Sequence, residues 1–180
     1  SGIFLSYGYK KIKQVDELHL PATADHKDSF QILQGEWGEF LLSDRVKTIG
    51  MGPCHSIILV NRDTKEMRMS HIDNDKKNIS SFLVGISESP VDWEVYIVGG
   101  ETYNSKIAIK KSLDQLKKHG VDDSQIKKDI LGCNERSILF KEGKLFLLHY
   151  PLSSRSHQDR TIMALRTMNE TELIEFKPRK

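Results

Sequence analysis

Cys54 and His71 are the residues of this chain whose types and spacing fit covalent chemistry. Cys54 ends the stretch Thr48-Ile49-Gly50-Met51-Gly52-Pro53-Cys54, and His71 follows it seventeen residues later. A cysteine thiol with its reference pKa of about 8.5 is mostly protonated at neutral pH, so it needs a neighbouring imidazole to yield an attacking thiolate. We therefore expect Cys54 to be a nucleophile and His71 its general base.

The residues before Cys54 fit the remaining parts of such a site. Gly50 and Gly52 permit a tight turn with little side-chain cover, so we expect a partly exposed thiol whose own amide, with one more nearby, faces an oxyanion. Thr48 has a hydroxyl and a carbonyl that could fix the tautomer and ring angle of His71. His55 directly follows Cys54 and is expected to project to the opposite face of its strand, away from the thiol.

Other readings of the same residues remain open. Judged by type and position, Cys54 also fits a small buried hydrophobic residue. One thiol with dispersed imidazoles lacks the paired ligands of a zinc site, so we expect no metal. The short glycine pattern at Gly50 and Gly52 leads into a strand and not a helix, which argues against a phosphate-binding loop. We expect no cofactor.

The overall composition is that of a globular domain. The 180 residues include 27 basic and 25 acidic side chains, a net charge of +2 that argues against binding nucleic acid through phosphate contacts. The two cysteines, Cys54 and Cys133, are too few for a disulfide framework and are expected to stay reduced. No apolar run approaches the roughly 20 residues that span a bilayer, so we expect no membrane association. We also expect a monomer.

The pattern of apolar residues predicts one central domain with two appended segments. We expect an irregular N-terminal extension at residues 1–35, a domain at 36–150, and a C-terminal tail at 151–180 that packs on the same domain. Predicted strands cover residues 36–43, 55–61, 66–70, 93–98, 136–140 and 144–149, and predicted helices cover 76–88 and about 104–120. This order favours an α/β fold: a layered α/β sandwich with a mixed, mostly antiparallel sheet core and two main helices.

The cysteine motif resembles a known family. Thr48-x-Gly50-x-Gly52-x-Cys54, an apolar strand and then His71 resemble the core of CheD, the bacterial chemoreceptor glutamine deamidases. The resemblance continues through Gly99-Gly100 and a following helix to Asp129, Gly132 and Arg136 before the last hairpin. It covers residues from about 40 to about 150.

The resemblance implies a cysteine hydrolase that converts a glutamine side chain of a partner protein to glutamate. It also implies a wider relation to the deamidase domains of toxins such as the cytotoxic necrotizing factors and the lethal-factor type. By this route Cys54 is the nucleophile, His71 the base and later acid, and Thr48 the residue that orients His71.

Departures from the family bear on the substrate. Pro53 stands where the family has serine, Leu131 and Glu135 stand where glycines are expected, and the two terminal segments have no counterpart. These additions favour a bacterial effector toxin, a virulence protein secreted into the host cytosol, over a chemoreceptor enzyme in the bacterial cytoplasm. A non-catalytic binding module and a cysteine hydrolase of peptide or isopeptide bonds are further alternatives.

Overall fold

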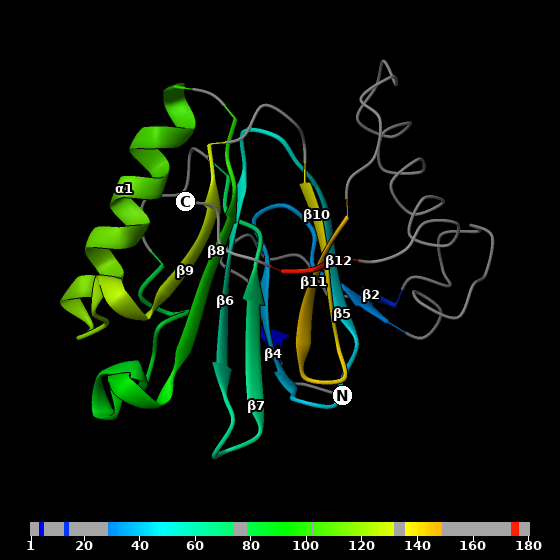
Figure 1. Ribbon diagram of the computed structural model, residues 1–180, viewed down its shortest axis with the longest axis vertical. Helices are drawn as coiled ribbons and strands as arrows, with labels where there is room; N and C mark the ends of the chain where they lie inside the picture. Colours follow the sequence, from blue (N-terminus) through cyan, green and yellow to red (C-terminus); the bar gives the residue numbers. More distant parts are fainter. Residues whose placement is uncertain are drawn as a thin grey trace.

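The structure is mixed α/β, with two sheets and one main helix in its described part (Figure 1). This computed structural model describes residues 4–5, 13–14, 29–73, 79–101, 103–131, 136–148 and 174–176. Strand pairs are antiparallel except for two parallel pairs, β3 with β5 and β8 with β9. The prediction of a mixed, mostly antiparallel sheet core is therefore confirmed.

The first sheet carries the strands on either side of the cysteine motif. Its order is β1-β4-β7-β6-β8-β9. The strands are β1 (Phe4–Leu5), β4 (Trp37–Leu41), β6 (His55–Asn61), β7 (Glu66–Ser70), β8 (Glu94–Gly99) and β9 (Ile126–Ile130). The helix α1 (Tyr103–Lys118) connects β8 to β9, which is the crossover that a parallel pair needs.

The second sheet faces the first across a shared core. Its order is β12-β11-β10-β5-β3-β2, with β2 (Lys13–Gln14), β3 (Phe30–Gln31), β5 (Val46–Met51), β10 (Arg136–Lys141), β11 (Lys144–Leu148) and β12 (Ile174–Glu175). Apolar side chains from both sheets meet in one cluster, which we call the inter-sheet core: Ile58, Met67, Met69 and Val98 from the first sheet, and Val46, Ile138 and Phe140 from the second.

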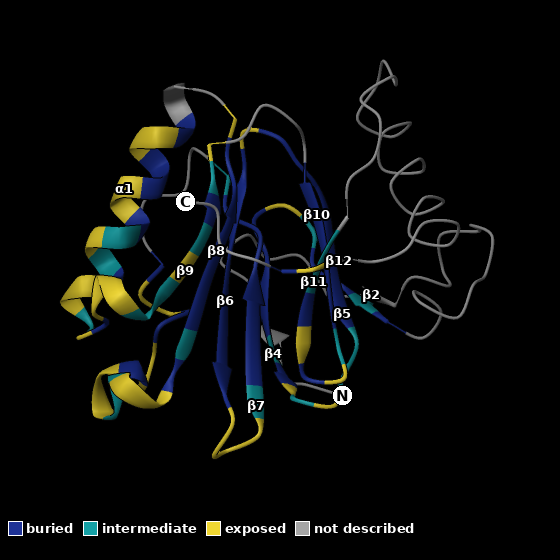
Figure 2. Ribbon diagram, in the orientation of Figure 1, coloured by how far each residue is buried: buried dark blue, intermediate teal, exposed yellow. Residues whose placement is uncertain are grey.

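The other face of the first sheet is covered by α1 and by residues 79–93. Ile57 and Ile97 of the sheet pack there against Leu116 of α1 and against Phe82. Figure 2 shows the result, with α1 buried along one side and exposed along the other. Because both faces of the first sheet are covered, β6 and β8 are buried almost throughout, which explains their long apolar runs.

The helix predicted at residues 76–88 is wrong in its described part. Residues 79–85 form turns, followed by two 3-10 helices at Ile86–Glu88 and Pro90–Asp92. The apolar spacing is real, because Ile79, Phe82, Leu83 and Ile86 are all buried. The guanidinium of Arg68, however, donates to the carbonyls of Phe82 and Val84, and Gly85 has a φ of 83°, so the chain turns away from a helical path.

The segment expected as an N-terminal extension contributes to both sheets. β3 pairs with β5 in parallel, and β1 pairs with β4. Residue 36 is therefore no structural boundary. In the tail, β12 pairs with β11 and Phe176 is buried in the inter-sheet core. The described helices include none with the length and apolar character needed to cross a membrane.

Lys47 is a fully buried lysine on β5, beside Thr48. Its ammonium nitrogen has no hydrogen-bond partner among the residues that the structure describes, and burial lowers its pKa to about 7. The unfolded chain, with a pKa near 10.5, therefore binds more protons than the folded chain between pH 7 and 10.5. The free energy of unfolding therefore rises with pH between pH 7 and 10.5 through this lysine.

We predict that Lys47→Met raises the free energy of unfolding at pH 6 by about 3 kcal/mol, because no charge then has to be desolvated. The advantage should shrink as the pH rises towards 10.5, because the unfolded lysine then gives up its proton at a smaller cost when the chain folds. Urea unfolding at pH 6 and pH 9.5 would measure both effects, with the exposed Lys144→Met as the matched control. Equal stability of Lys47→Met and wild type at pH 6 would contradict this account.

Candidate active site

Cys54 lies in the connection between β5 of the second sheet and β6 of the first, at the upper end of Figure 1. Its glycines shape the loop. Gly50 has a φ of 68° and donates its amide hydrogen to Ser137 Oγ at 3.0 Å, while the Gly52 amide donates to the Gly50 carbonyl at 3.1 Å. Both glycine amides are thus used inside the fold, where they set the conformation of the loop.

Two further bonds hold the end of this loop against the first sheet. Ser105 Oγ on α1 donates to the carbonyl of Pro53 at 2.8 Å, and the amide of Gly100 donates to the carbonyl of Cys54 at 2.9 Å. Gly99 has a φ of 121°, and a Cβ there would lie 2.5 Å from the Cys54 carbonyl oxygen. The Gly99-Gly100 pair of the sequence is therefore required for Cys54 to approach β8 this closely.

Strand register brings Cys54 and His71 to the same face of the first sheet. His55 and Ile72 exchange two backbone hydrogen bonds, of 3.0 and 2.7 Å, at an antiparallel bridge. Cys54 and His71 each precede one of these residues, so they are diagonal neighbours whose side chains point to one side. Cβ atoms in such a diagonal pair lie about 7 Å apart, within reach of an imidazole.

A β-bulge at Gly35 and Glu36, just before β4, holds the backbone of His71 on the side away from β6. The amide of Gly35 donates to the His71 carbonyl at 2.8 Å, and the His71 amide donates to the carbonyl of Glu36 at 2.9 Å. Two residues thus oppose one, and Gly35 has the φ of 81° that this kind of bulge requires. Bulges of this kind commonly re-aim a side chain next to a functional site.

Thr48 contacts His71 across the two sheets. Thr48 Oγ1 lies 2.6 Å from His71 Nδ1 and donates its hydrogen to the carbonyl of Ile32 at 2.8 Å. A threonine hydroxyl has one proton, so with Ile32 as its acceptor it can only accept from His71. We therefore assign the proton of the neutral imidazole to Nδ1, which leaves Nε2 with a lone pair and able to act as a base.

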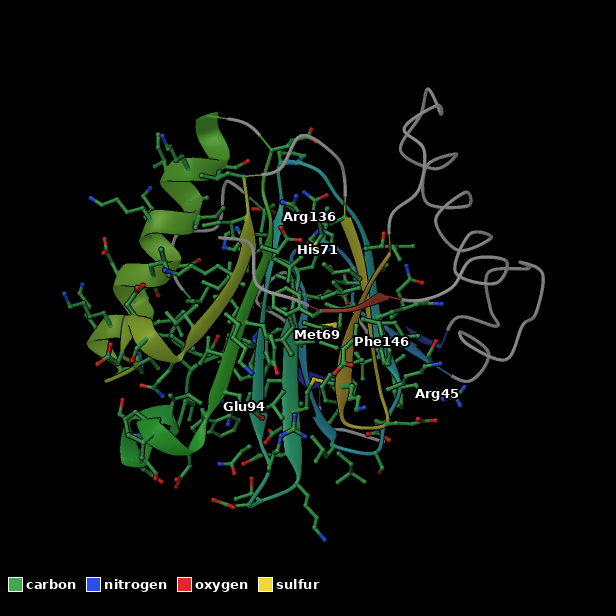
Figure 3. The ribbon with its side chains drawn as sticks, viewed as in Figure 1. Arg45, Met69, His71, Glu94, Arg136 and Phe146 are labelled. Atoms are coloured by element: carbon green, nitrogen blue, oxygen red, sulfur yellow. The ribbon has the colours of Figure 1, made fainter. Side chains whose placement is uncertain are left out.

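Arg136 links the sheets on the other side of Cys54. It lies on β10, is almost completely buried, and donates from Nη2 to the carbonyl of Gly100 at 3.0 Å. Its Nε is 3.8 Å from a carboxylate oxygen of Asp129 on β9. Figure 3 shows Arg136 and His71 at the same end of the two sheets, with Met69 farther into the core. The sequence offered Asp129 and Arg136 only as family landmarks.

The site is more enclosed than expected. Cys54 keeps 7% of its surface exposed and His71 keeps 3%, where we had expected a partly exposed thiol. Pro53, immediately before Cys54, is exposed. Cys54 is therefore nearly enclosed, and its exposed neighbour at this rim is Pro53.

His55 lies on the opposite face from Cys54, as predicted. Its Nε2 is 2.8 Å from Ser112 Oγ on α1, and burial lowers its pKa to about 4. The side chain is neutral at physiological pH and belongs to the packing of α1. Among the functional residues that the sequence did not indicate is Ile32, whose carbonyl sets the direction of the Thr48 hydroxyl and which lies in the expected N-terminal extension.

We predict that Thr48→Val lowers the free energy of unfolding by about 1–3 kcal/mol, because it leaves the Ile32 carbonyl and the His71 Nδ1 hydrogen unpaired in a buried place. Thr48→Ser keeps the hydroxyl and should lose much less. Urea unfolding of the two variants at neutral pH would measure the difference. Equal losses would show that the methyl group matters here and the hydroxyl does not.

We also predict that His55 makes the protein sensitive to acid. Its pKa is about 4 when folded and 6.5 in its reference state, so the unfolded chain binds the extra proton and stability falls as the pH drops from about 6.5 towards 4. The full loss from this group is about 3 kcal/mol. His55→Gln should unfold with a shallower dependence on pH in urea titrations between pH 4 and 7; parallel curves for the variant and wild type would refute the assignment.

Comparisons with known proteins complete the description of the site. No family model matches the chain, and a search of the curated proteins gives no match. The functional interpretation therefore rests on the residues at the rim and on their geometry.

Proposed function

We propose that this protein is a protein-glutamine deamidase in which Cys54 is the nucleophile, His71 the base and later acid, and Thr48 the residue that orients His71. The substrate is a glutamine side chain of a partner protein, and neither a metal nor a cofactor takes part in the proposed reaction. The relation to the CheD-like deamidases, with their layered α/β sandwich, is part of the same proposal.

One observation carries the proposal: the hydroxyl of Thr48 donates to Ile32 and so accepts from Nδ1 of His71. This bond leaves Nε2 as the basic nitrogen of a buried ring on the face that Cys54 shares. An imidazole whose tautomer is fixed by a third residue is the arrangement that activates a thiol in cysteine hydrolases.

The reaction follows from these positions. His71 Nε2 takes the thiol proton, and the Cys54 sulfur attacks the carboxamide carbon, with the amide of Cys54 proposed as a donor to the oxyanion. The C–N bond breaks as His71 gives the proton to the departing ammonia, leaving a thioester. Water then hydrolyses the thioester to the glutamate carboxylate. The partner gains one negative charge, which alters a local interface.

Pro53, which is exposed beside Cys54 and departs from the family, supports an effector that acts on a protein in the host cytosol, because a different residue at this place favours a different partner. Deamidation of a chemoreceptor in the bacterial cytoplasm is the alternative with the same chemistry. Cleavage of a peptide or isopeptide bond differs only in its leaving group.

The burial of Cys54 favours a second candidate function. With only 7% of its surface exposed, Cys54 also fits a binding module that keeps this fold without turnover. Such a module would present the exposed Pro53 and the surrounding loop to its partner.

We predict that Cys54→Ala and His71→Ala each abolish glutamine-to-glutamate conversion in a cell lysate, by a thousandfold or more if turnover is otherwise fast, since about that much depends on the nucleophile and base. Mass spectrometry would detect the one-dalton gain on a partner glutamine. Cys133→Ala is the matched control and should stay active. Alkylation by iodoacetamide at neutral pH should also be much faster at Cys54 than at Cys133.

Conversion that persists in Cys54→Ala would exclude Cys54 as the nucleophile. If the wild type converts no glutamine and its Cys54 reacts no faster than Cys133, the binding module becomes the better account.

A further inference from the structure

Ser56 is a buried serine beside the candidate site with a hydroxyl that has no partner in the described part of the chain. It lies on β6, two residues after Cys54, and none of its surface is exposed. Buried hydroxyls are nearly always hydrogen-bonded, because leaving one unpaired costs stability. An unpaired hydroxyl at this position therefore calls for a function.

Register places the Ser56 side chain on the same face of the first sheet as Cys54 and His71. Ser56 pairs with Val98 of β8, and both Val98 and Ile58, two residues farther along β6, point into the inter-sheet core. The β6–β7 register, with Ile58 opposite Met69 and His55 opposite Ile72, puts Ser56 directly opposite His71. Both side chains therefore lie on the inner side of the first sheet, and at the neighbouring position Ser70 Oγ replaces backbone groups in the bonds to Ile57.

Ser70, a neighbouring buried serine, shows what a satisfied hydroxyl looks like here. Its Oγ accepts from the amide of Ile57 and donates to the carbonyl of Ile57, both at 3.0 Å. Ser70 is as fully buried as Ser56 and lies on the partner strand. The two serines therefore differ in hydrogen bonding and not in burial, which makes them a matched pair for experiment.

We propose that the Ser56 hydroxyl holds the water molecule that hydrolyses the acyl-enzyme. This inference rests on the proposed deamidase. The water oxygen forms the new C–O bond with the thioester carbon and His71 Nε2 takes one of its protons, while the other hydrogen stays on the water oxygen and forms a hydrogen bond to Ser56 Oγ. The C–S bond then breaks with its electron pair returning to sulfur, and the imidazolium proton restores the Cys54 thiol.

A chromogenic ester separates the two halves of this reaction without the partner protein. With p-nitrophenyl acetate, the sulfur of Cys54 takes the acetyl group and releases nitrophenolate, and water then releases acetate. The Cys133→Ala protein, in which Cys54 is the single thiol, should give a burst of nitrophenolate followed by slower turnover. Adding Cys54→Ala should remove the burst.

Ser56→Ala should keep the burst but slow the steady rate by about tenfold or more, since it removes only the positioning of water. Intact mass measurement should then show acetylated Cys54 accumulating. A burst with an unchanged steady rate in Ser56→Ala would overturn the inference and leave the nucleophile standing. The absence of a burst in the Cys133→Ala protein, which retains Ser56, would overturn the proposed function itself.

Stability provides a second readout. Ser70→Ala should lower the urea midpoint because it breaks two hydrogen bonds, whereas Ser56→Ala should leave the midpoint unchanged or raise it. If Ser56→Ala lowers the midpoint as much as Ser70→Ala, the Ser56 hydroxyl serves the fold and the inference fails.

Discussion

The two sheets must keep their spacing at one end for the site to exist, because Thr48 belongs to one sheet and His71 to the other. The hydroxyl that joins them is only 2.6 Å from the imidazole, so a small change in sheet separation would break the contact. The apolar side chains of the inter-sheet core set that separation, among them Met69 two residues before His71 and Val46 two residues before Thr48. Packing in the core therefore acts directly on the orientation of the candidate base.

Cys54 depends on a different set of contacts, made mostly by backbone. Gly100 holds its carbonyl, Ser105 holds the carbonyl before it, and Arg136 in turn holds the carbonyl of Gly100. The guanidinium is buried and reaches the residue after β8, whereas Thr48 on the neighbouring strand reaches the residue after β7. The thiol and the imidazole are thus held by separate contacts. The Thr48–His71 contact lies on the β7 side of β6, and the Arg136–Gly100 contact lies on the β8 side.

The sequence predicted the strands and the helix that are strongly apolar or strongly periodic. β6, β7, β8, α1 and the hairpin of β10 and β11 lie where alternation and helical spacing indicated. β5 and β9 were missed because charged residues interrupt them: Lys47 is buried in β5, and Lys127, Lys128 and Asp129 fill the middle of β9. The spacing that predicted a helix at 76–88 reflects burial under the first sheet, which turns achieve equally well here.

The sequence singled out residues of distinctive chemistry, and it gave no sign of groups whose role comes from their position. Cysteine, histidine and the glycine loop could be named from type and spacing, and the structure brings Thr48 and His71 into contact. Nothing in the sequence marks Ser56 or the carbonyl of Ile32, since serines and backbone oxygens occur throughout any chain. Their importance depends on register between strands, which a single sequence does not specify.

The segment from Ile32 to Glu36 passes from β3 to β4, and its carbonyl at Ile32 determines which imidazole nitrogen bears hydrogen. A protein trimmed to begin at residue 36 would retain the cysteine, the histidine and the threonine. Its threonine, having lost that acceptor, could turn its hydrogen towards the ring and push the ring's own hydrogen to Nε2. Such a shortened protein would keep every residue of the motif and lose the Nε2 lone pair on which the proposed reaction relies.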